Sequence, residues 1–166
     1  FSPVAAEDLD GALPATIEIR AYLRAPKAMV QADSTQIKQV MINLGNNAGQ
    51  AMPSGGLLEV KMTTEHLGAK AAAGISLDLA PGWYVRISVR DTGTGIEEAI
   101  LPRIFDPFFT TRSKAEGTGM GLSVVHGIVK DHQGAVTVHS RPGQGSTFTV
   151  YLPRLRMRAK GTGTTR

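Results

Sequence analysis

Hydrophobic and polar positions alternate with a period of two in several parts of this chain. Between residues 16 and 23, Ile17, Ile19 and Leu23 are separated by polar side chains, which predicts a strand. The same reasoning predicts further strands at residues 29–32, 57–63, 83–89, 135–139 and 147–152. The Gly- and Ala-rich residues 67–82 are predicted to form a loop or a short helix.

Two other segments have the period of a helix. Asp33 is a candidate N-cap for a helix at residues 33–52, which Pro53 and Gly55 end. Its apolar stripe is Ile37, Val40, Met41, Leu44, Ala48 and Ala51. A second helix is predicted at residues 119–132, with Gly134 just beyond its end. These elements predict an α/β fold: a two-layer α/β sandwich in which a mixed β-sheet of about five strands packs against about three helices.

The composition narrows the class of protein. With 166 residues and 42% hydrophobic content, the chain is expected to fold around one core. It has no cysteine, which excludes disulfides and thiolate metal sites and favours an intracellular location. No apolar stretch approaches the roughly 20 residues of a membrane-spanning helix, and the N-terminus lacks a signal-peptide layout. A domain without direct membrane contact is expected.

Charge and periodicity divide the chain into three parts. Residues 1–14 are predicted to be an irregular lead-in or the remnant of an upstream region, residues 15–153 the folded domain, and residues 154–166 a basic flexible tail. The net charge is +4, and much of it lies in this tail. Because no aromatic residues interleave with the tail's charges, we expect no binding of nucleic acid there.

Carboxamide side chains flank the apolar stripe of the first helix. Asn43, Asn47 and Gln50 are spaced at i, i+4 and i+7, so they lie on one face. Amide oxygens can complete the coordination of a Mg²⁺ ion that already holds phosphate oxygens and waters. The spacing alone fits a solvated polar face better, and it decides nothing by itself.

Two glycine-rich segments follow. Asp91 ends a predicted strand and precedes Gly93, Gly95 and Ile96; an ionised carboxylate there suits the exocyclic amino group of adenine, although Asp and Gly are also ordinary turn residues. Residues 117–122 lead into the second helix, where free backbone N–H groups favour a phosphate. Neither segment has the spacing of the P-loop or of dinucleotide-binding folds.

Residues 103–112 lie between the two glycine-rich segments and contain three of the five phenylalanines in the chain. They fit a buried cluster under a long loop. They also fit a hinged lid that moves Thr110, Thr111, Arg112 and Lys114 onto the phosphates of a nucleotide.

The order of these segments resembles the catalytic, ATP-binding domain of bacterial sensor histidine kinases, within the wider GHKL ATPase superfamily. The resemblance covers about residues 28–153. Residues 43–48 resemble the N box of that family, residues 91–95 its first glycine box and residues 105–109 its F box. Residues 117–122 resemble the second glycine box, and residues 143–148 resemble the last one. Five motifs in the family's order make a chance match very improbable.

The resemblance implies roles for particular residues. Asn47 would ligate Mg²⁺ and Asn43 would support the metal or the phosphates, so these two form the catalytic pair. Asp91 would read the adenine amino group, and Ser146 or Thr147 would add a polar contact near the base. Residues 106–118 would form the lid. The whole implied ATP-binding set is Asn43, Asn47, Asp91, Gly93, Gly95, Ile96, Thr110, Thr111, Arg112, Gly117, Thr118, Gly119, Met120, Gly121, Leu122 and Thr147.

One position favours phosphoryl transfer over hydrolysis. In the superfamily's ATP hydrolases, the residue four before the magnesium-binding Asn is typically a Glu that acts as general base, and here it is Asn43, whose amide cannot take a proton. The resemblance therefore implies the catalytic domain of a two-component sensor histidine kinase, which binds Mg-ATP and transfers the γ-phosphate to a histidine. A GHKL-type ATP hydrolase, or a nucleotide-binding switch or regulatory module, is the alternative.

The acceptor histidine is expected outside this chain. His66, His126, His132 and His139 all lack the acidic residue that usually follows the family's acceptor, so we expect structural or solvent-exposed roles for them. The resemblance implies an N-terminal helical hairpin that carries the acceptor and dimerises, and a downstream response regulator or receiver domain. It implies a cytoplasmic location, including the cytoplasmic part of a membrane-anchored receptor.

Overall fold

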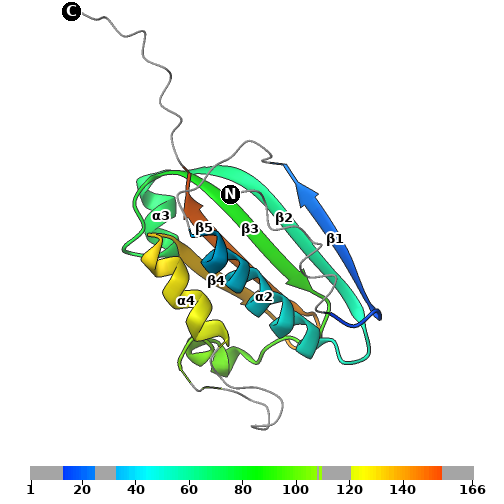
Figure 1. The fold of residues 1–166 in the computed structure, drawn as a ribbon. Coiled ribbons are helices and arrows are strands. Elements are labelled where there is room, and N and C mark those ends of the chain that lie inside the picture. The colour runs from blue at the N-terminus through cyan, green and yellow to red at the C-terminus, as the bar shows by residue number, and fades with distance from the viewer. Residues whose placement is uncertain (1–12, 25–32, 108, 110–120, 155–166) are drawn as a thin grey trace, which may run out of the picture.

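The chain folds into a mixed sheet with helices on it. The computed structural model describes residues 13–24, 33–107, 109 and 121–154, without the side chain of Leu23. The sheet has the order β1-β2-β3-β5-β4, with bounds Ile17–Leu23, Gly56–Leu67, Gly82–Asp91, Ser146–Pro153 and Ala135–Ser140 in that order. The β1–β2 pair is parallel and the other three pairs are antiparallel. Helices α2 (Ser34–Ala51) and α4 (Gly121–Asp131) lie side by side on one face (Figure 1). The predicted fold class is confirmed.

Helix α2 forms as its sequence predicts. The side chain of Asp33 accepts hydrogen bonds from the backbone N–H groups of Thr35 and Gln36, which satisfies two of the free donors at the helix start. The predicted stripe is buried from Ile37 to Ala48, whereas Ala51, at the last turn, is half-buried. The stripe packs on the strand residues that alternate toward it, namely Leu58, Val60, Val85, Ile87, Val89, Phe148 and Val150.

A smaller core lies on the opposite face of the sheet. Tyr84 and Tyr151 alternate with Val85 and Val150, so they point away from α2 and α4. Helix α3 (Ala69–Ile75) packs its buried Ala72 into this cluster. Residues 67–82 therefore contain the short helix that was one of the two predicted outcomes.

Strand β2 is longer than predicted because its second half is held by a partner. Thr64, Glu65 and His66 pair with β3 beyond the predicted end of the strand. The ring of His66 meets that of Trp83 edge-on, with centroids 5.2 Å apart. Cross-strand pairs of this kind stabilise a sheet without leaving an alternating apolar pattern in the sequence.

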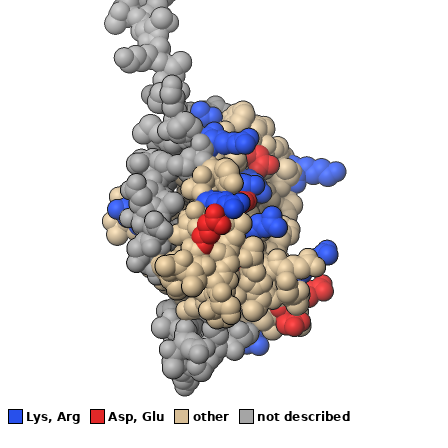
Figure 2. Space-filling view, turned by 90° about the vertical axis from the view of Figure 1, so that its right-hand side faces the viewer, with Lys and Arg blue, Asp and Glu red and all other residues tan. Residues whose placement is uncertain are grey.

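The rest of this second face carries charged side chains of both signs. Arg20 pairs with Glu18, Lys61 with Glu59 and Arg86 with Glu65, at N–O distances of 3.1, 3.0 and 3.6 Å. Figure 2 views the molecule from the side on which β1 lies. Lys and Arg side chains gather over the upper half of the molecule in this view, with acidic side chains between them. Exposed pairs contribute little to stability, so the helix-side core carries the fold.

Helix α4 ends in a left-handed cap. Gln133 has a φ of 59°, and the N–H of Gly134 donates to the carbonyl of Val129 at 2.9 Å. A Cβ at Gly134 would lie 2.1 Å from the carbonyl oxygen of Tyr151, so glycine is required there by the close approach of β5.

None of the described helices has the length and apolar content needed to cross a membrane.

Candidate functional site

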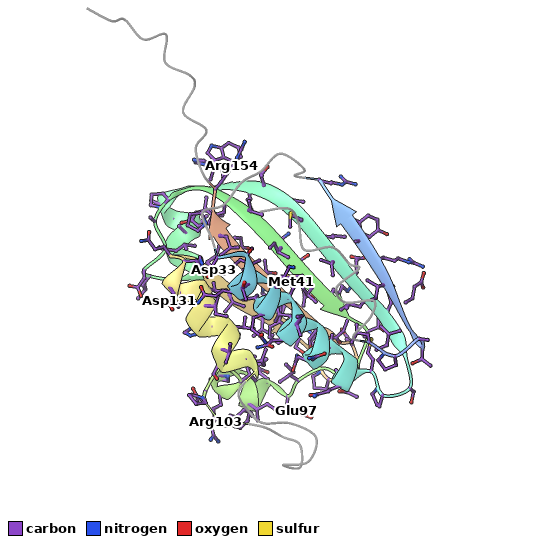
Figure 3. All side chains as sticks on the ribbon, in the orientation of Figure 1. Asp33, Met41, Glu97, Arg103, Asp131 and Arg154 are labelled. Carbon is purple, nitrogen blue, oxygen red and sulfur yellow. The ribbon has the colours of Figure 1, made fainter. Side chains whose placement is uncertain are left out.

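A cavity of about 320 Å³ opens where four parts of the chain meet. They are the end of α2, the loop after β3 with the 3₁₀ helix η1 (Glu98–Arg103), the start of α4 and the start of β5. Figure 3 shows Glu97 of this wall at the end of the sheet opposite to Arg154. The cavity is lined by Asn47, Gln50, Ala51, Thr94, Gly95, Ile96, Glu97, Ile100, Ile104, Phe109, Leu122 and Ser146.

Four of the nine described residues of the candidate ATP-binding set line this cavity. Asn47, Gly95, Ile96 and Leu122 line it directly. Gly121 and Asn43 are hydrogen-bonded to each other between α4 and α2, and Asp91 is bonded to both Gly93 and Ser146. The remaining candidates, Thr110, Thr111, Arg112, Gly117, Thr118, Gly119 and Met120, lie outside the described residues, as does the predicted strand at 29–32.

Asp91 is a buried carboxylate just behind the cavity wall. It is 2% exposed, and its Oδ1 accepts hydrogen bonds from the N–H groups of Gly93 at 2.9 Å and Ser146 at 3.2 Å. Burial raises the pKa of Asp91 above its ordinary value, and these two hydrogen bonds act in the opposite direction. Asp91 does not line the cavity itself, but it is hydrogen-bonded to Ser146, which does.

Glycines allow the backbone of the loop after β3 to approach the backbone of the β4–β5 turn closely. Gly95 has a φ of +73°, and a Cβ there would lie 2.0 Å from the carbonyl oxygen of Arg141. On the other side of the contact, Gly145 has a φ of +80°, and its Cβ would lie 2.1 Å from the carbonyl oxygen of Asp91. The loop and the β4–β5 turn are therefore pressed together, and the N–H of Gly143 donates to the carbonyl of Thr94 at 2.7 Å.

The pleat of β5 determines which of Ser146 and Thr147 lies at the cavity. Ser146 lines the cavity and lies on the helix side of the sheet, the same side as the core residue Phe148. Thr147 lies between them and therefore points to the opposite face. The structure thus does not bring Thr147, a member of the candidate set, to the cavity.

Asn43 makes a specific contact between two helices. Its Nδ2 donates to the carbonyl oxygen of Gly121 at 3.0 Å, and its Oδ1 accepts from Nε2 of Gln39 at 2.5 Å. Both ends of the amide are thus engaged within the protein. Asn43 joins α2 to the first residue of α4, and Gln39, which sequence reasoning did not single out, orients it.

The aromatic segment packs beside the cavity. The ring of Phe105 lies 5.5 Å from that of His126 on α4 and 6.3 Å from that of Phe148 on β5. Ile104 is buried, and the guanidinium of Arg103 lies 4.7 Å from the ring of Phe109. Phe105 and Phe109 are half-buried and pack against the helix-side core. Of the lid predicted at residues 106–118, the structure describes only residues 106, 107 and 109.

None of the four histidines lines the cavity. His132 lies just after the end of α4, next to the start of α2. Its Nε2 accepts a hydrogen bond from the N–H of Asp33 at 3.3 Å, and its Nδ1 lies 2.7 Å from the carbonyl oxygen of Ile128. His66 and His126 pack on aromatic rings, and His139 is exposed on β4. These are the structural and solvent-exposed roles expected from the sequence.

The donor set around the cavity suits a cation that brings its own ligands. Within the described ranges, no three His, Cys, Asp or Glu side chains come together as a metal site. The cavity offers the amides of Asn47 and Gln50 and the carboxylate of Glu97. Mg²⁺ is commonly held by one or two protein oxygens together with phosphates and waters, so these residues fit that ion.

Comparison with known proteins matches the same span. The family model for "Histidine kinase-, DNA gyrase B-, and HSP90-like ATPase" matches residues 32–156. The chain is 46% identical over 127 residues to "Sensor kinase CckA" of Brucella abortus (strain 2308), which is 76% of this chain and 13% of that protein. It therefore spans a small part of the length of that relative.

Solved structures agree with the family model. The catalytic domain of histidine kinase ThkA, in a nucleotide-free form, has a TM-score of 0.64 and 30% identity, with 90% of this chain and 86% of that chain covered. Full-length ShkA in complex with AMPPNP has a TM-score of 0.67 and 25% identity, with 90% of this chain and 29% of that chain covered.

Proposed function

Because the chain belongs to the histidine kinase-, DNA gyrase B- and HSP90-like ATPase family, as a catalytic ATP-binding domain of the sensor histidine kinase type, we propose that it binds Mg-ATP in the cavity beside α2 and transfers the γ-phosphate to a histidine on a separate dimerisation hairpin. The observation that carries the proposal is the convergence of Asn47, Gly95, Leu122 and Ser146, from four separate motifs, on one cavity. The similarity to ShkA, whose structure is a complex with AMPPNP, supports a nucleotide as the ligand.

The base of the nucleotide would lie at the Ser146 end. Asp91 accepts hydrogen bonds only, when ionised, and would take one from the amino group of adenine through its second oxygen. Ile96, Ile100 and Ile104 supply an apolar wall for the ring.

The phosphates would lie between α2 and the start of α4. The backbone N–H groups at the start of α4 and the positive end of its dipole favour an anion there. Asn47 would hold Mg²⁺ through its amide oxygen, with Gln50 one turn further along. When bound, the ion neutralises charge on the transferring phosphate. Asn43 would act on the phosphates through Gly121, whose carbonyl it holds.

The transfer step requires little covalent chemistry from this domain. A neutral imidazole nitrogen of the acceptor attacks the γ-phosphorus, the bond from that phosphorus to the β–γ bridging oxygen breaks, and ADP leaves with the electron pair. The contribution of this chain is to position the triphosphate and to exclude water from the γ-phosphorus. Asn43 cannot accept a proton from water, and both ends of its amide are already hydrogen-bonded.

ATP hydrolysis is the competing proposal, and one observation favours it. Glu97 lines the cavity and carries the carboxylate that a general base for water requires. Steady-state phosphate release by the domain that is lost in Glu97→Gln and unchanged in Asn43→Ala would support hydrolysis over transfer.

The test is phosphoryl transfer in trans. The domain is mixed with a matched hairpin, Mg²⁺ and ATP labelled in the γ-phosphate, and the expected product is a phosphohistidine that is labile in acid and stable in alkali. Asn47→Asp should abolish transfer, whereas Asp78→Asn, at the far end of the sheet, should leave it unchanged. Failure to label a matched hairpin by a domain that binds ATP would overturn the proposal of transfer.

The wider setting of the domain is proposed with the same reaction. We propose that residues 15–153 form the kinase domain, with residues 154–166 as a basic tail. A response regulator or receiver domain would take the phosphate from the histidine, and the domain would work in the cytoplasm.

A further inference from the structure

Ser140 lies behind the cavity and joins three segments that line or support it. It is the last residue of β4, and it is not itself a lining residue. Its Oγ accepts a hydrogen bond from the N–H of Ile96 at 2.8 Å and lies 3.1 Å from the carbonyl oxygen of Gly145 and 2.7 Å from Oγ of Ser146. Two of its partners, Ile96 and Ser146, belong to the cavity wall.

The hydroxyl chemistry of this cluster allows two arrangements of protons. A serine hydroxyl donates once and accepts twice. If Ser140 donates to Gly145, then Ser146 donates to Ser140 and offers only an acceptor to the cavity. If Ser140 instead donates to Ser146, it gives up its hydrogen bond to the Gly145 carbonyl, which still accepts from the N–H of Arg141 at 3.4 Å, and the Ser146 proton can be donated into the cavity.

We propose that Ser140 is a positioning residue that fixes the Ser146 hydroxyl and lets it present a proton to the base of the nucleotide. The proposal rests on the nucleotide site proposed above. Ser140 also holds the N–H of Ile96, so the same side chain sets the position of the loop after β3 and the orientation of the hydroxyl on β5.

This arrangement selects the edge of the purine. Adenine carries a donor at its 6-amino group and an acceptor at N1, which match the Asp91 carboxylate and a donating Ser146. Guanine carries an acceptor at O6 and a donor at N1, the reverse order. An oriented Ser146 therefore strengthens binding of adenine nucleotides without strengthening binding of guanine nucleotides.

The experiment compares ATP and GTP affinities by isothermal titration calorimetry, with Mg²⁺ present, for wild type and a small set of variants. Ser140→Ala removes the hydroxyl, and Ser140→Thr restores it. Ser146→Ala and the double variant Ser140→Ala/Ser146→Ala test whether Ser140 acts through Ser146. Thr137→Val removes a hydroxyl from the same strand, away from the cavity, and serves as the matched control.

Ser140→Ala should weaken ATP binding roughly 3- to 10-fold, the usual effect of one lost hydrogen bond, and change GTP binding less than about twofold. Ser140→Thr and Thr137→Val should bind ATP like wild type, and Ser140→Ala should have a smaller effect in the Ser146→Ala background. Equal losses for ATP and GTP, or full additivity in the double variant, would reduce Ser140 to a structural residue and overturn the inference. If wild type itself binds no ATP, the proposed function fails; if wild type binds and Ser140→Ala binds alike, this inference alone fails.

Discussion

Asp91→Asn should change nucleotide affinity and stability in opposite directions. The amide oxygen of Asn can still accept from the N–H groups of Gly93 and Ser146, as Oδ1 of Asp91 does. The second oxygen is replaced by an NH₂ group, which cannot accept a hydrogen bond from the adenine amino group. The substitution therefore keeps the fold of the loop and removes the acceptor.

The size of the binding loss follows from burial. Asp91 is 2% exposed, so water cannot replace the lost acceptor. A hydrogen bond to a charged group contributes about 1.5–3 kcal/mol, which corresponds to a roughly 10- to 150-fold weaker affinity for ATP.

The stability of the nucleotide-free protein should move the other way. Burial raises the pKa of Asp91 in the folded state, so the folded protein holds this proton more tightly than the unfolded chain. The contribution of Asp91 to stability is therefore greatest below its ordinary pKa of 3.8 and is lost as the pH rises through the folded-state pKa. Asn at this position removes that loss, so the variant should gain on wild type as the pH rises across this window.

Two assays check the predicted loss of ATP affinity and the predicted gain in stability. Calorimetric titration with Mg-ATP measures the affinity, and urea unfolding from about pH 3 to pH 8 measures the free energy of unfolding. Asp78→Asn, a carboxyl removed from the other end of the sheet, is the matched control and should change neither. Wild-type affinity for ATP in Asp91→Asn, or a loss of stability at neutral pH in that variant, would refute the role proposed for the Asp91 carboxylate.

Three further variants test individual contacts. Gly143→Ala, at a φ of +76° in open space, should lower the free energy of unfolding in urea by roughly 1–2 kcal/mol, the cost of a left-handed residue. Gly95→Ala, at a φ of +73°, should lower it by more, because its Cβ would also lie 2.0 Å from the carbonyl oxygen of Arg141. Asp33→Ala removes the N-cap of α2 and should lower the free energy of unfolding by about 1 kcal/mol; an unchanged midpoint would contradict the capping role. Asn43→Asp places an acceptor against the carbonyl of Gly121 and should cost about 1–3 kcal/mol in the same assay, with weaker ATP binding by calorimetry, whereas equal stability would show that the α2–α4 contact is unimportant.

Features set by local sequence were predictable. The Asp33 cap and the buried stripe of α2 depend on side chains within one or two turns, and both are present. The end of β2 was not predictable, because Thr64 to His66 form a strand only through pairing with β3.

The candidate site shows the same division. The glycines of the loop after β3 were found by their motif, but the reason for Gly95 is a carbonyl of the β4–β5 turn, far along the chain. The contacts of Asn43 and Ser140 depend on residues that only the fold brings near, and a serine at the end of a strand has no distinctive pattern. Ser146 could have been preferred to Thr147 by placing Phe148 in the core and applying the alternation of a strand.

The most direct test of the account is a map of Mg-ATP binding on the ¹⁵N-labelled domain by NMR. If Mg-ATP binds in this cavity, titration should shift the backbone amide signals of Asn47, Gly95 and Ser146, which line or border it, and leave that of Trp83, at the opposite end of the sheet, in place. No shifts at millimolar Mg-ATP, or shifts centred on Trp83, would contradict it.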